Sequence, residues 1–317
     1  MRTSIIIRII CWAVLALCLL GLLLWVLAGN GPRALPFSFN FFDRSGQISF
    51  GTLEGEVGAY SPSNAYSVDA DGIEQIKISW VDGDVTLTPY DGQTISFKET
   101  ARAEIPEKYA LRYALSGSAL TIHYSQGVQI LPAWHSAKSL EVLVPRALAA
   151  ELGEVAVDAV SAGVRLTGIK CDRIDVDTTS GSIIIKEVEG EKITMSSTSG
   201  RLETEDCTVA DIEADSVSGA INLQGAFTEV ETDNVSGSAS ITSDICPREV
   251  NMDNVSGSAA LLIPENQGFT ARYDTVSGGF RCDFPASISK SAVIYGDGSA
   301  SFHITSVSGS IRIEQIG

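Results

Sequence analysis

The sequence predicts an all-β protein: a parallel β-solenoid (β-helix or β-roll) of two-strand coils, each of about 19–20 residues, behind one N-terminal transmembrane helix. Three observations predict this fold. A Ser-Gly phrase recurs at a nearly fixed interval, apolar residues alternate on both sides of each phrase, and one long apolar stretch lies near the N-terminus.

The composition suits an all-β protein and argues against two classes of partner. Of the 317 residues 29 are glycine, only 19% are charged, and the net charge is −17. Nucleic acids and anionic lipid headgroups attract surfaces rich in lysine and arginine. We therefore expect this acidic chain neither to bind nucleic acid nor to dock on anionic lipid.

The Ser-Gly phrase sets the period. From Gly163, in the weaker copy Ser161-Ala162-Gly163, to Gly278 the glycines are 18, 19, 19, 18, 20 and 21 residues apart. An interval near 20 is typical of units that stack to bury their apolar faces. We expect the glycines to form a structural corner between strands, where positive φ favours glycine. These corner glycines are Gly181, Gly200, Gly219, Gly237, Gly257, Gly278 and Gly309.

Each unit contains two short strands. Apolar residues alternate after the glycine, as at Ile183 and Ile185, and before it, as at Ile174 and Val176. Two such strands and two corners use about 19 residues, one coil that advances roughly 4.8 Å. A period near 20 also suits an antiparallel meander or barrel.

A small polar residue stands three positions before each glycine, and its recurrence favours parallel stacking, because only there does a residue lie over its counterpart. In stacked coils these residues would form a ladder of side-chain hydrogen bonds, which is a structural role. The set is Thr178, Ser197, Ser216, Asn234, Asn254, Thr275 and Ser306.

The N-terminal residues predict a membrane anchor. Residues 9–28 are almost all apolar, and as a helix they span roughly 30 Å, the thickness of a bilayer core. Arg2 and Arg8 precede them, which places residues 1–8 in the cytoplasm and the rest outside it. A cleaved signal peptide is the alternative, although the apolar run exceeds the usual length of about 7–15 residues. The prediction is a single-pass protein of the cell membrane.

The rest of the chain divides into three parts. Residues 29–71 form a linker whose Phe37, Phe39, Phe41 and Phe42 either rest on the lipid interface or pack under the first coil. Residues 72–152 are an irregular β section, with Asp82-Gly83 as a turn, that caps the solenoid. Residues 153–317 are the Ser-Gly solenoid, closed by a C-terminal cap that contains the last two strands, residues 302–304 and 311–313.

No residues point to catalysis, a cofactor or a metal of known motif. The corner serines are equivalent by repeat, and catalysis needs a singular arrangement. His123, His135 and His303 match no motif. Cys171, Cys207, Cys246 and Cys282 are spaced 36, 39 and 36 residues, close to two coils, so we expect free thiols rather than disulfides.

Aspartates four residues before the glycines are the one candidate site. Stacking would place them in an outward row about 4.8 Å apart where consecutive, and a cation could bridge them. The alternative is that water and salt screen these carboxylates. The row consists of Asp177, Asp215, Asp233, Asp253 and Asp274.

Several features together resemble the bacterial "putative adhesin" family of β-strand repeats, a domain of unknown function. They are the N-terminal anchor, residues 76–89 with their Asp-Gly turn, Leu140–Pro145, the serial Ser-Gly units, and Tyr295-Gly296-Asp297-Gly298 leading to Ile313. The resemblance covers residues 73–316 and implies a membrane-tethered cell-surface solenoid without catalytic residues. At the position after each Ser-Gly, where that family often has Asp or Asn, this chain has Ser182, Arg201, Ala220, Ser238 and Ser258.

The leading functional hypothesis is a non-enzymatic surface protein that presents a long β face to a protein or an envelope polymer. The second is an accessory or sensor protein for envelope stress that works with membrane partners. A third, a β-helical polysaccharide-degrading enzyme, would need a singular cluster of basic and carboxylate groups that the sequence lacks.

Overall fold

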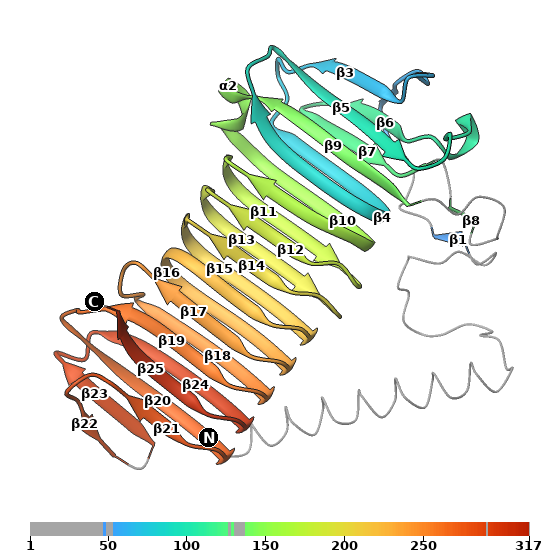
Figure 1. Ribbon diagram of the computed structural model, residues 1–317. Coiled ribbons are helices and arrows are strands. Elements are labelled where there is room, and N and C mark those ends of the chain that lie inside the picture. The colour runs from blue at the N-terminus through green and yellow to red at the C-terminus, as the bar shows by residue number, and fades with distance from the viewer. Residues whose placement is uncertain (1–46, 49–52, 126–127, 130–136, 290, 317) are drawn as a thin grey trace, which may run out of the picture.

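The protein is an elongated stack of β-coils (Figure 1). The structure, a computed structural model, describes residues 47–48, 53–125, 128–129, 137–289 and 291–316. Strands make up 69% of these residues and helix only 3%, so the predicted all-β class is confirmed. Within these ranges no helix has the length and apolar character that a membrane crossing requires. The helix predicted over residues 9–28 and the four linker phenylalanines lie outside them.

Each coil contributes one strand to each of two parallel ladders, which we call ladder A (before the Ser-Gly corner) and ladder B (after it). Some strands bend at the corner and belong to both ladders. Ladder A runs through β4 (Gln75–Tyr90), β10 (Leu152–Thr167), β11 (Lys170–Thr178), β13 (Glu189–Ser197), β15 (Cys207–Ser218), β16 (Ile221–Ser236) and β18 (Glu249–Ser256). Ladder B continues from β4 and β10 through β12 (Ile183–Lys186), β14 (Leu202–Glu205), β16, β17 (Ala239–Ser243) and β19 (Ala259–Pro264).

The core lies between the ladders and consists of columns of like residues. Ile174, Ile193, Ile212, Val230 and Val250 stand directly over one another and are at most 2% exposed. Burying a side chain of this size contributes about 1.5–3 kcal/mol. The alternation of buried and exposed residues along each strand is therefore what aligns the coils.

The corner glycines are required by close approach of neighbouring coils. A Cβ atom on Gly219 would lie 1.9 Å from the carbonyl oxygen of Gly200, and a Cβ on Gly200 would lie 1.9 Å from that of Gly181. We expected positive φ to be the cause. Among the seven corner glycines φ is positive only at Gly237, Gly257 and Gly309, so the shared cause is the space that the neighbouring carbonyl needs.

Six of the seven polar residues three positions before the glycines are buried, and Thr275 of the outermost coil is partly exposed, but they do not bond mainly to one another. The Asn234 Nδ2 donates to the carbonyl oxygen of Gly219 at 3.0 Å, and the Ser306 Oγ donates to that of Gly257 at 3.1 Å. The Thr178 Oγ1 accepts from the backbone N–H of Gly181 at 3.1 Å. The predicted ladder thus connects these side chains to the backbone of the corner glycines, often to a glycine of the neighbouring coil.

The first corner differs from the expectation by one residue. In β10 it is Ala162, not Gly163, that pairs with Gly83 of the coil before and whose carbonyl faces Gly181. Counting from Ala162 makes the first interval 19 residues, equal to the next two. Gly163, which directly follows Ala162, resembles the corner glycines in the sequence but does not occupy the corner.

The N-terminal end is more regular than predicted, and the folded part begins earlier. β4 bends at Asp82-Gly83 and stacks in parallel on β10, so this turn is a coil corner. The predicted linker extends too far, because Tyr66 and Val68 are buried in a strand that belongs to the end cap. Around β4 lie β2 (Glu56–Val57), β3 (Ala65–Asp69), β5 (Thr94–Ala101), η1 (Glu107–Tyr109), β6 (Arg112–Ser116), β7 (Ala119–His123), β9 (Lys138–Pro145) and α2 (Arg146–Ala149); β1 (Gln47–Ile48) pairs with β8 (Val128–Gln129).

A buried ion pair holds this cap together. The Lys138 Nζ donates to the Glu99 Oε2 at 2.6 Å and to the backbone carbonyls of Tyr109 at 2.6 Å and Tyr124 at 2.5 Å. The other Glu99 oxygen accepts from the backbone N–H of Leu111 at 2.8 Å. Both ionic side chains are fully buried, and burial lowers the pKa of Lys138 to about 8.

Replacing Lys138 by methionine is expected to lower the free energy of unfolding by about 3 kcal/mol, because the Glu99 carboxylate loses its buried partner. The partly exposed Lys77–Glu154 pair is the control, and Lys77→Met should cost less than about 1 kcal/mol. Urea unfolding of both variants makes the comparison. Equal losses would show that the buried pair adds no more than a surface pair.

The C-terminal end departs from sequence order. β20 (Gly268–Ser277) and β21 (Phe280–Cys282) form the outermost coil, and the last coil of the chain, β24 (Ala300–Ser308) and β25 (Ile311–Ile316), lies between it and β18/β19. The predicted cap is therefore wrong for the last two strands, which are internal. The outer edge carries β22 (Ser287–Ile288) and β23 (Ala292–Gly296). β23 pairs antiparallel with β20, and β22 pairs antiparallel with β23.

Side-chain polarity explains this order. Phe302, Ile304 and Ile313 of the inserted coil are at most 1% exposed. In the outer coil, Ala271 is buried opposite Phe302, whereas Tyr273 and Cys282, which pair with Ile304 and Ile313, are more polar and partly exposed. The more apolar coil takes the position with neighbours on both sides, and the amphipathic coil tolerates the end.

Candidate functional site

The outward surface of ladder A carries the predicted aspartates. In stacking order the row contains Ser79, Asp158, Asp177, Ser196, Asp215, Asp233, Asp253, Thr305 and Asp274. All five predicted residues lie in it and none is buried. Asp158 was missed because the count began at Gly163, and Thr305 separates Asp253 from Asp274 because the last coil is inserted between theirs.

Two further carboxylate rows lie beside the aspartates, one over three consecutive coils and one over the first two of them, where Asn251 takes the third place. We call the eight carboxylates of these coils the acidic face: Asp211, Glu213, Asp215, Glu229, Glu231, Asp233, Glu249 and Asp253. Two basic side chains contact it. Lys192 lies 3.0 Å from Asp211 and 2.9 Å from Glu213, and Arg248 pairs with Glu229.

The acidic face shifts the ionisation of its central member. Partial burial, and next the negative charges of Asp233, Glu213 and Glu231, raise the pKa of Asp215 to about 6. The pKa of Asp177 is also raised, first by burial and then by Asp175. Like charges about 4.8 Å apart therefore oppose stacking at neutral pH.

Asp215→Asn should raise the free energy of unfolding at pH 7.5 by on the order of 1 kcal/mol, after allowance for solvent screening. The folded-state pKa is raised, so the folded protein binds more protons than the unfolded chain between about pH 4 and 6, and wild-type stability falls as pH rises through this window. The gain from the substitution should accordingly vanish near pH 4. Urea unfolding at both pH values tests this, with exposed Asp244→Asn as control.

A line of carboxylates is not a closed coordination sphere. Among the residues that the structure describes, no three His, Cys, Asp or Glu side chains are grouped as metal ligands. The cation row stays a prediction, and the acidic face is best described as a charged surface.

A row of valines lies beside the acidic face, at the residue before each Ser-Gly, and all of them are exposed except Val307, which is partly exposed. We call it the valine ladder: Val217, Val235, Val255, Val307 and Val276, in stacking order. Val217 is 48% exposed, Val255 40% and Val276 80%. The sequence held a signal for it that was not used: these phrases are Val-Ser-Gly, whereas the two preceding ones are Thr-Ser-Gly.

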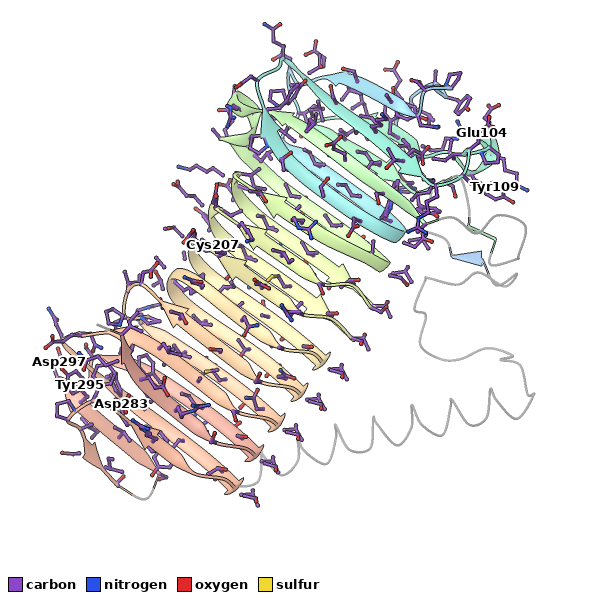
Figure 2. All side chains as sticks on the ribbon, viewed as in Figure 1. Glu104, Tyr109, Cys207, Asp283, Tyr295 and Asp297 are labelled. Carbon is purple, nitrogen blue, oxygen red and sulfur yellow. The ribbon has the colours of Figure 1, made fainter. Side chains whose placement is uncertain are left out.

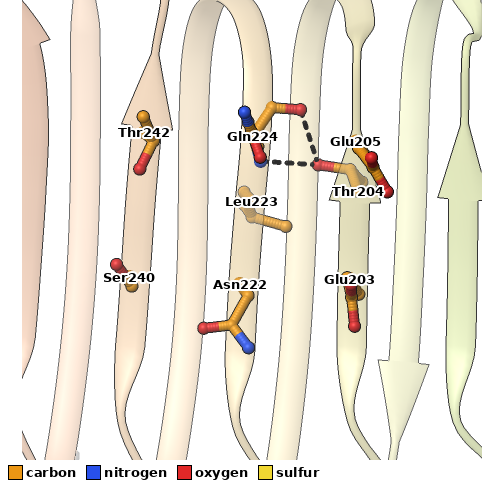
Figure 3. Close-up of a pocket in the computed structure, with 8 residues that line it drawn as sticks. All are labelled: Glu203, Thr204, Glu205, Asn222, Leu223, Gln224, Ser240 and Thr242. Atoms are coloured by element: carbon orange, nitrogen blue, oxygen red, sulfur yellow. Dashed lines mark hydrogen bonds between the residues drawn. The ribbon is translucent and has the colours of Figure 1, made fainter.

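Ladder B has a shallow polar hollow of about 310 Å³ (Figure 3). It lies where β14 and β16 pair at only two positions. The buried Thr204 Oγ1 accepts from the backbone N–H of Gln224 at 3.0 Å and donates to its carbonyl at 3.2 Å, which replaces the missing strand pairing. Glu203, Glu205, Asn222, Ser240 and Thr242 also line the hollow. It has carboxylates, amides and hydroxyls but no basic or aromatic group.

The cysteines and histidines form no common site in the described ranges. All four described cysteines are free, as predicted, and Cys171 and Cys207 are buried. Burial raises the pKa of the Cys171 thiol to about 11, so it is not a reactive thiolate at neutral pH. His123 lies in the N-terminal cap and His303 near the C-terminal end, while His135 lies outside the described residues. Figure 2 shows that the outward side chains instead repeat from coil to coil.

Comparison with known proteins gives a family. A family model described as Toastrack DUF4097 matches residues 73–314, nearly the range over which the resemblance was seen. This confirms a family of β-strand repeats, and it does not bear on the predicted membrane anchor. A search of the curated proteins found no match.

Solved structures give weak likenesses of fold. A "putative lipid binding protein" from Parabacteroides distasonis is 16% identical, with a TM-score of 0.48 over 84% of this chain and 98% of that chain. A "putative adhesin" from Bacteroides fragilis is 12% identical, with a TM-score of 0.46 over 81% and 100%. Another "putative adhesin", from Parabacteroides merdae, is 12% identical, with a TM-score of 0.41 over 84% and 98%. At these values the three structures assign no ligand to this chain.

Proposed function

The chain belongs to the Toastrack DUF4097 family, and from that premise we propose that it is a membrane-anchored, extracytoplasmic protein that acts by binding rather than by catalysis. Its rod presents long β faces to a protein or an envelope polymer. Residues 9–28 anchor it in the cell membrane, with residues 1–8 in the cytoplasm.

The observation that carries this proposal is the repetition of the outward side chains. Rows such as the acidic face and the valine ladder offer the same group in successive coils, about 4.8 Å apart. An extended ligand can contact several equivalent groups at once, and many weak contacts then add to a useful affinity. Catalysis instead requires one arrangement of distinct groups around a reacting atom.

Labelling of cysteine variants tests the topology. Ser256→Cys places a thiol on the exposed corner, and Ser4→Cys places one before the predicted anchor. The partly exposed native thiols Cys246 and Cys282 are first replaced by serine in both variants. In spheroplasts that express the full chain, a membrane-impermeant maleimide should then label the first variant and not the second. After permeabilisation it should label both. Labelling of Ser256→Cys only after permeabilisation would contradict an extracytoplasmic rod.

Removing residues 1–28 tests whether the rod itself is the binding part. The shortened protein, added to envelopes of cells that lack the gene, should sediment with them and compete with a labelled copy of itself. Binding that requires residues 1–28 would instead favour the role of a sensor that acts with membrane partners.

A further inference from the structure

We propose that the valine ladder and the acidic face together bind a basic amphipathic polypeptide segment of a partner protein, laid along the axis of the rod. This inference rests on the proposed display function and names the partner class for one surface. The apolar side of the segment would cover the valines, and its lysines and arginines would lie over the carboxylates.

The apolar half of the surface is a continuous row rather than scattered residues. The five valines occupy five successive coils and extend about 19 Å along the rod. Single exposed apolar residues are ordinary on a protein surface, whereas a contiguous row marks a place where something binds.

Strand formation does not explain the choice of valine. The equivalent residues of the two preceding coils are Thr179 and Thr198, which are also exposed. Threonine and valine have the same shape and similar strand propensity, so either residue suits a strand at this position. The first two coils also have valine at this position, the partly exposed Val81 and Val160. After the two threonines, valine returns at Val217 beside Asp215, in the coil where the three-carboxylate pattern starts, and it is then kept in every coil to the end of the rod.

The charged half selects a cationic partner. The acidic face carries eight carboxylates, of which Asp211 and Glu213 pair with Lys192 and Glu229 pairs with Arg248. Partial burial and, after it, repulsion by the neighbouring carboxylates raise the pKa of Asp215, so approaching positive charge would relieve the repulsive part of this unfavourable state. Complementary charge also steers association and rejects wrong partners.

The same charges exclude other occupants of this surface. A second copy of the acidic face would bring like charges together, and an anionic lipid surface or nucleic acid would be repelled. A metal ion or polyamine would neutralise the carboxylates but leave the valines in water. Only a chain that carries both apolar and cationic groups satisfies both halves.

The repeat of the rod fits a helical segment. One helical turn advances about 5.4 Å and one coil about 4.8 Å, so over four steps the mismatch is only about 2.4 Å. The flexible stems of lysine and arginine can absorb such an offset. A helix of about 18 residues, or roughly 27 Å, would cover the whole valine ladder.

Binding of a designed peptide to the full chain tests the proposal. The probe is a fluorescent helical peptide of about 18 residues with one stripe of leucine flanked by lysine, the remainder alanine. The protein is held in phosphatidylcholine nanodiscs, and empty nanodiscs give the background. Two matched peptides serve as controls: one has glutamate for lysine, and one has the same composition with the leucines scattered around the helix.

The probe should bind at least about tenfold more tightly than either control peptide, and its affinity should fall as salt rises. The triple variant Val217→Thr, Val235→Thr and Val255→Thr should weaken binding at least about tenfold, since it removes the apolar contact and keeps the shape. The triple variant Asp215→Asn, Asp233→Asn and Asp253→Asn should weaken it comparably and reduce the salt dependence.

Either of two results would overturn the proposal: equal binding of the scattered peptide, which would mean attraction by charge alone, or unchanged affinity of the threonine variant. The aspartate variant should be at least as stable as the wild type, because it loses the repulsion between carboxylates. Weaker peptide binding by this variant would therefore not result from misfolding. Failure here would leave the labelling result for Ser256→Cys untouched, so it is distinguishable from failure of the proposed display function.

Discussion

Replacing Gly219 by valine is expected to lower the free energy of unfolding by about 5 kcal/mol or more, enough to unfold the middle of the rod. A Cβ atom there would lie 1.9 Å from the Gly200 carbonyl oxygen and 3.0 Å from the Ser216 Oγ. The carbonyl belongs to the backbone of a stacked coil and cannot move away without breaking strand pairing. Chemical unfolding followed by circular dichroism measures the loss.

Gly279 provides the matched control, because a Cβ atom on it would have nothing within 4 Å. Gly279→Val should cost less than about 1 kcal/mol, as surface substitutions usually do. If Gly219→Val were as stable as Gly279→Val, the corner glycines would not be packed against one another as described.

Deleting residues 299–317 removes the coil that lies between β18/β19 and β20/β21. It is expected to unfold the coils on both sides of it, rather than only to shorten the rod at its end. These residues supply the inserted coil, whose Phe302, Ile304 and Ile311 pack between β18/β19 and β20/β21. Without them the apolar faces of two coils are exposed at once. Hydrogen exchange should show lost protection in both β18 and β20.

The outcome separates two arrangements of the C-terminus. A terminal cap could be removed with fraying limited to its nearest coil, so β20 and β21 would keep their protection and only the end would change. Full protection of β20 in the shortened chain would contradict the insertion.

The repeating part of the fold could be predicted because it depends on local patterns. The alternation that buries Ile183 and Ile185 and the period that stacks Gly200 on Gly181 are both visible in the sequence. Parallel stacking followed from the recurrence of a polar residue at the corner. The reason for glycine could not be read locally, because it depends on the carbonyl of another coil.

The two ends could not be predicted, because their order is decided by competition between coils that the period treats as equal. Val276-Ser277-Gly278 and Val307-Ser308-Gly309 carry the same phrase. Which of them stacks on Gly257 depends on whether Ile304 or Tyr273, which occupy equivalent positions, is better buried, and this is a comparison of whole coils. Likewise Lys138 and Glu99 are separated by 39 residues, and no local pattern pairs them.

The sequence predicts the aspartate row of the candidate site but not the valine ladder. The aspartate row followed from the period, and Asp158 was lost only through the one-residue offset at Ala162. The valine ladder was overlooked because valine in a strand is ordinarily assigned to the core. Its exposure depends on where the strand bends at the corner.

Distances between spin labels on the corner serines test the stacking most directly. With Ser161→Cys as the common reference, labels at Ser256→Cys, Ser308→Cys and Ser277→Cys are five, six and seven coils away, or about 24, 29 and 34 Å along the backbone at 4.8 Å per coil. Double electron–electron resonance spectroscopy measures all three distances, in a protein whose partly exposed Cys246 and Cys282 are replaced by serine. The structure predicts that Ser308 lies nearer to Ser161 than Ser277 does. A shorter distance to Ser277, or distances that do not grow by one coil at each step, would contradict a rod of coils stacked in register with the last coil inserted.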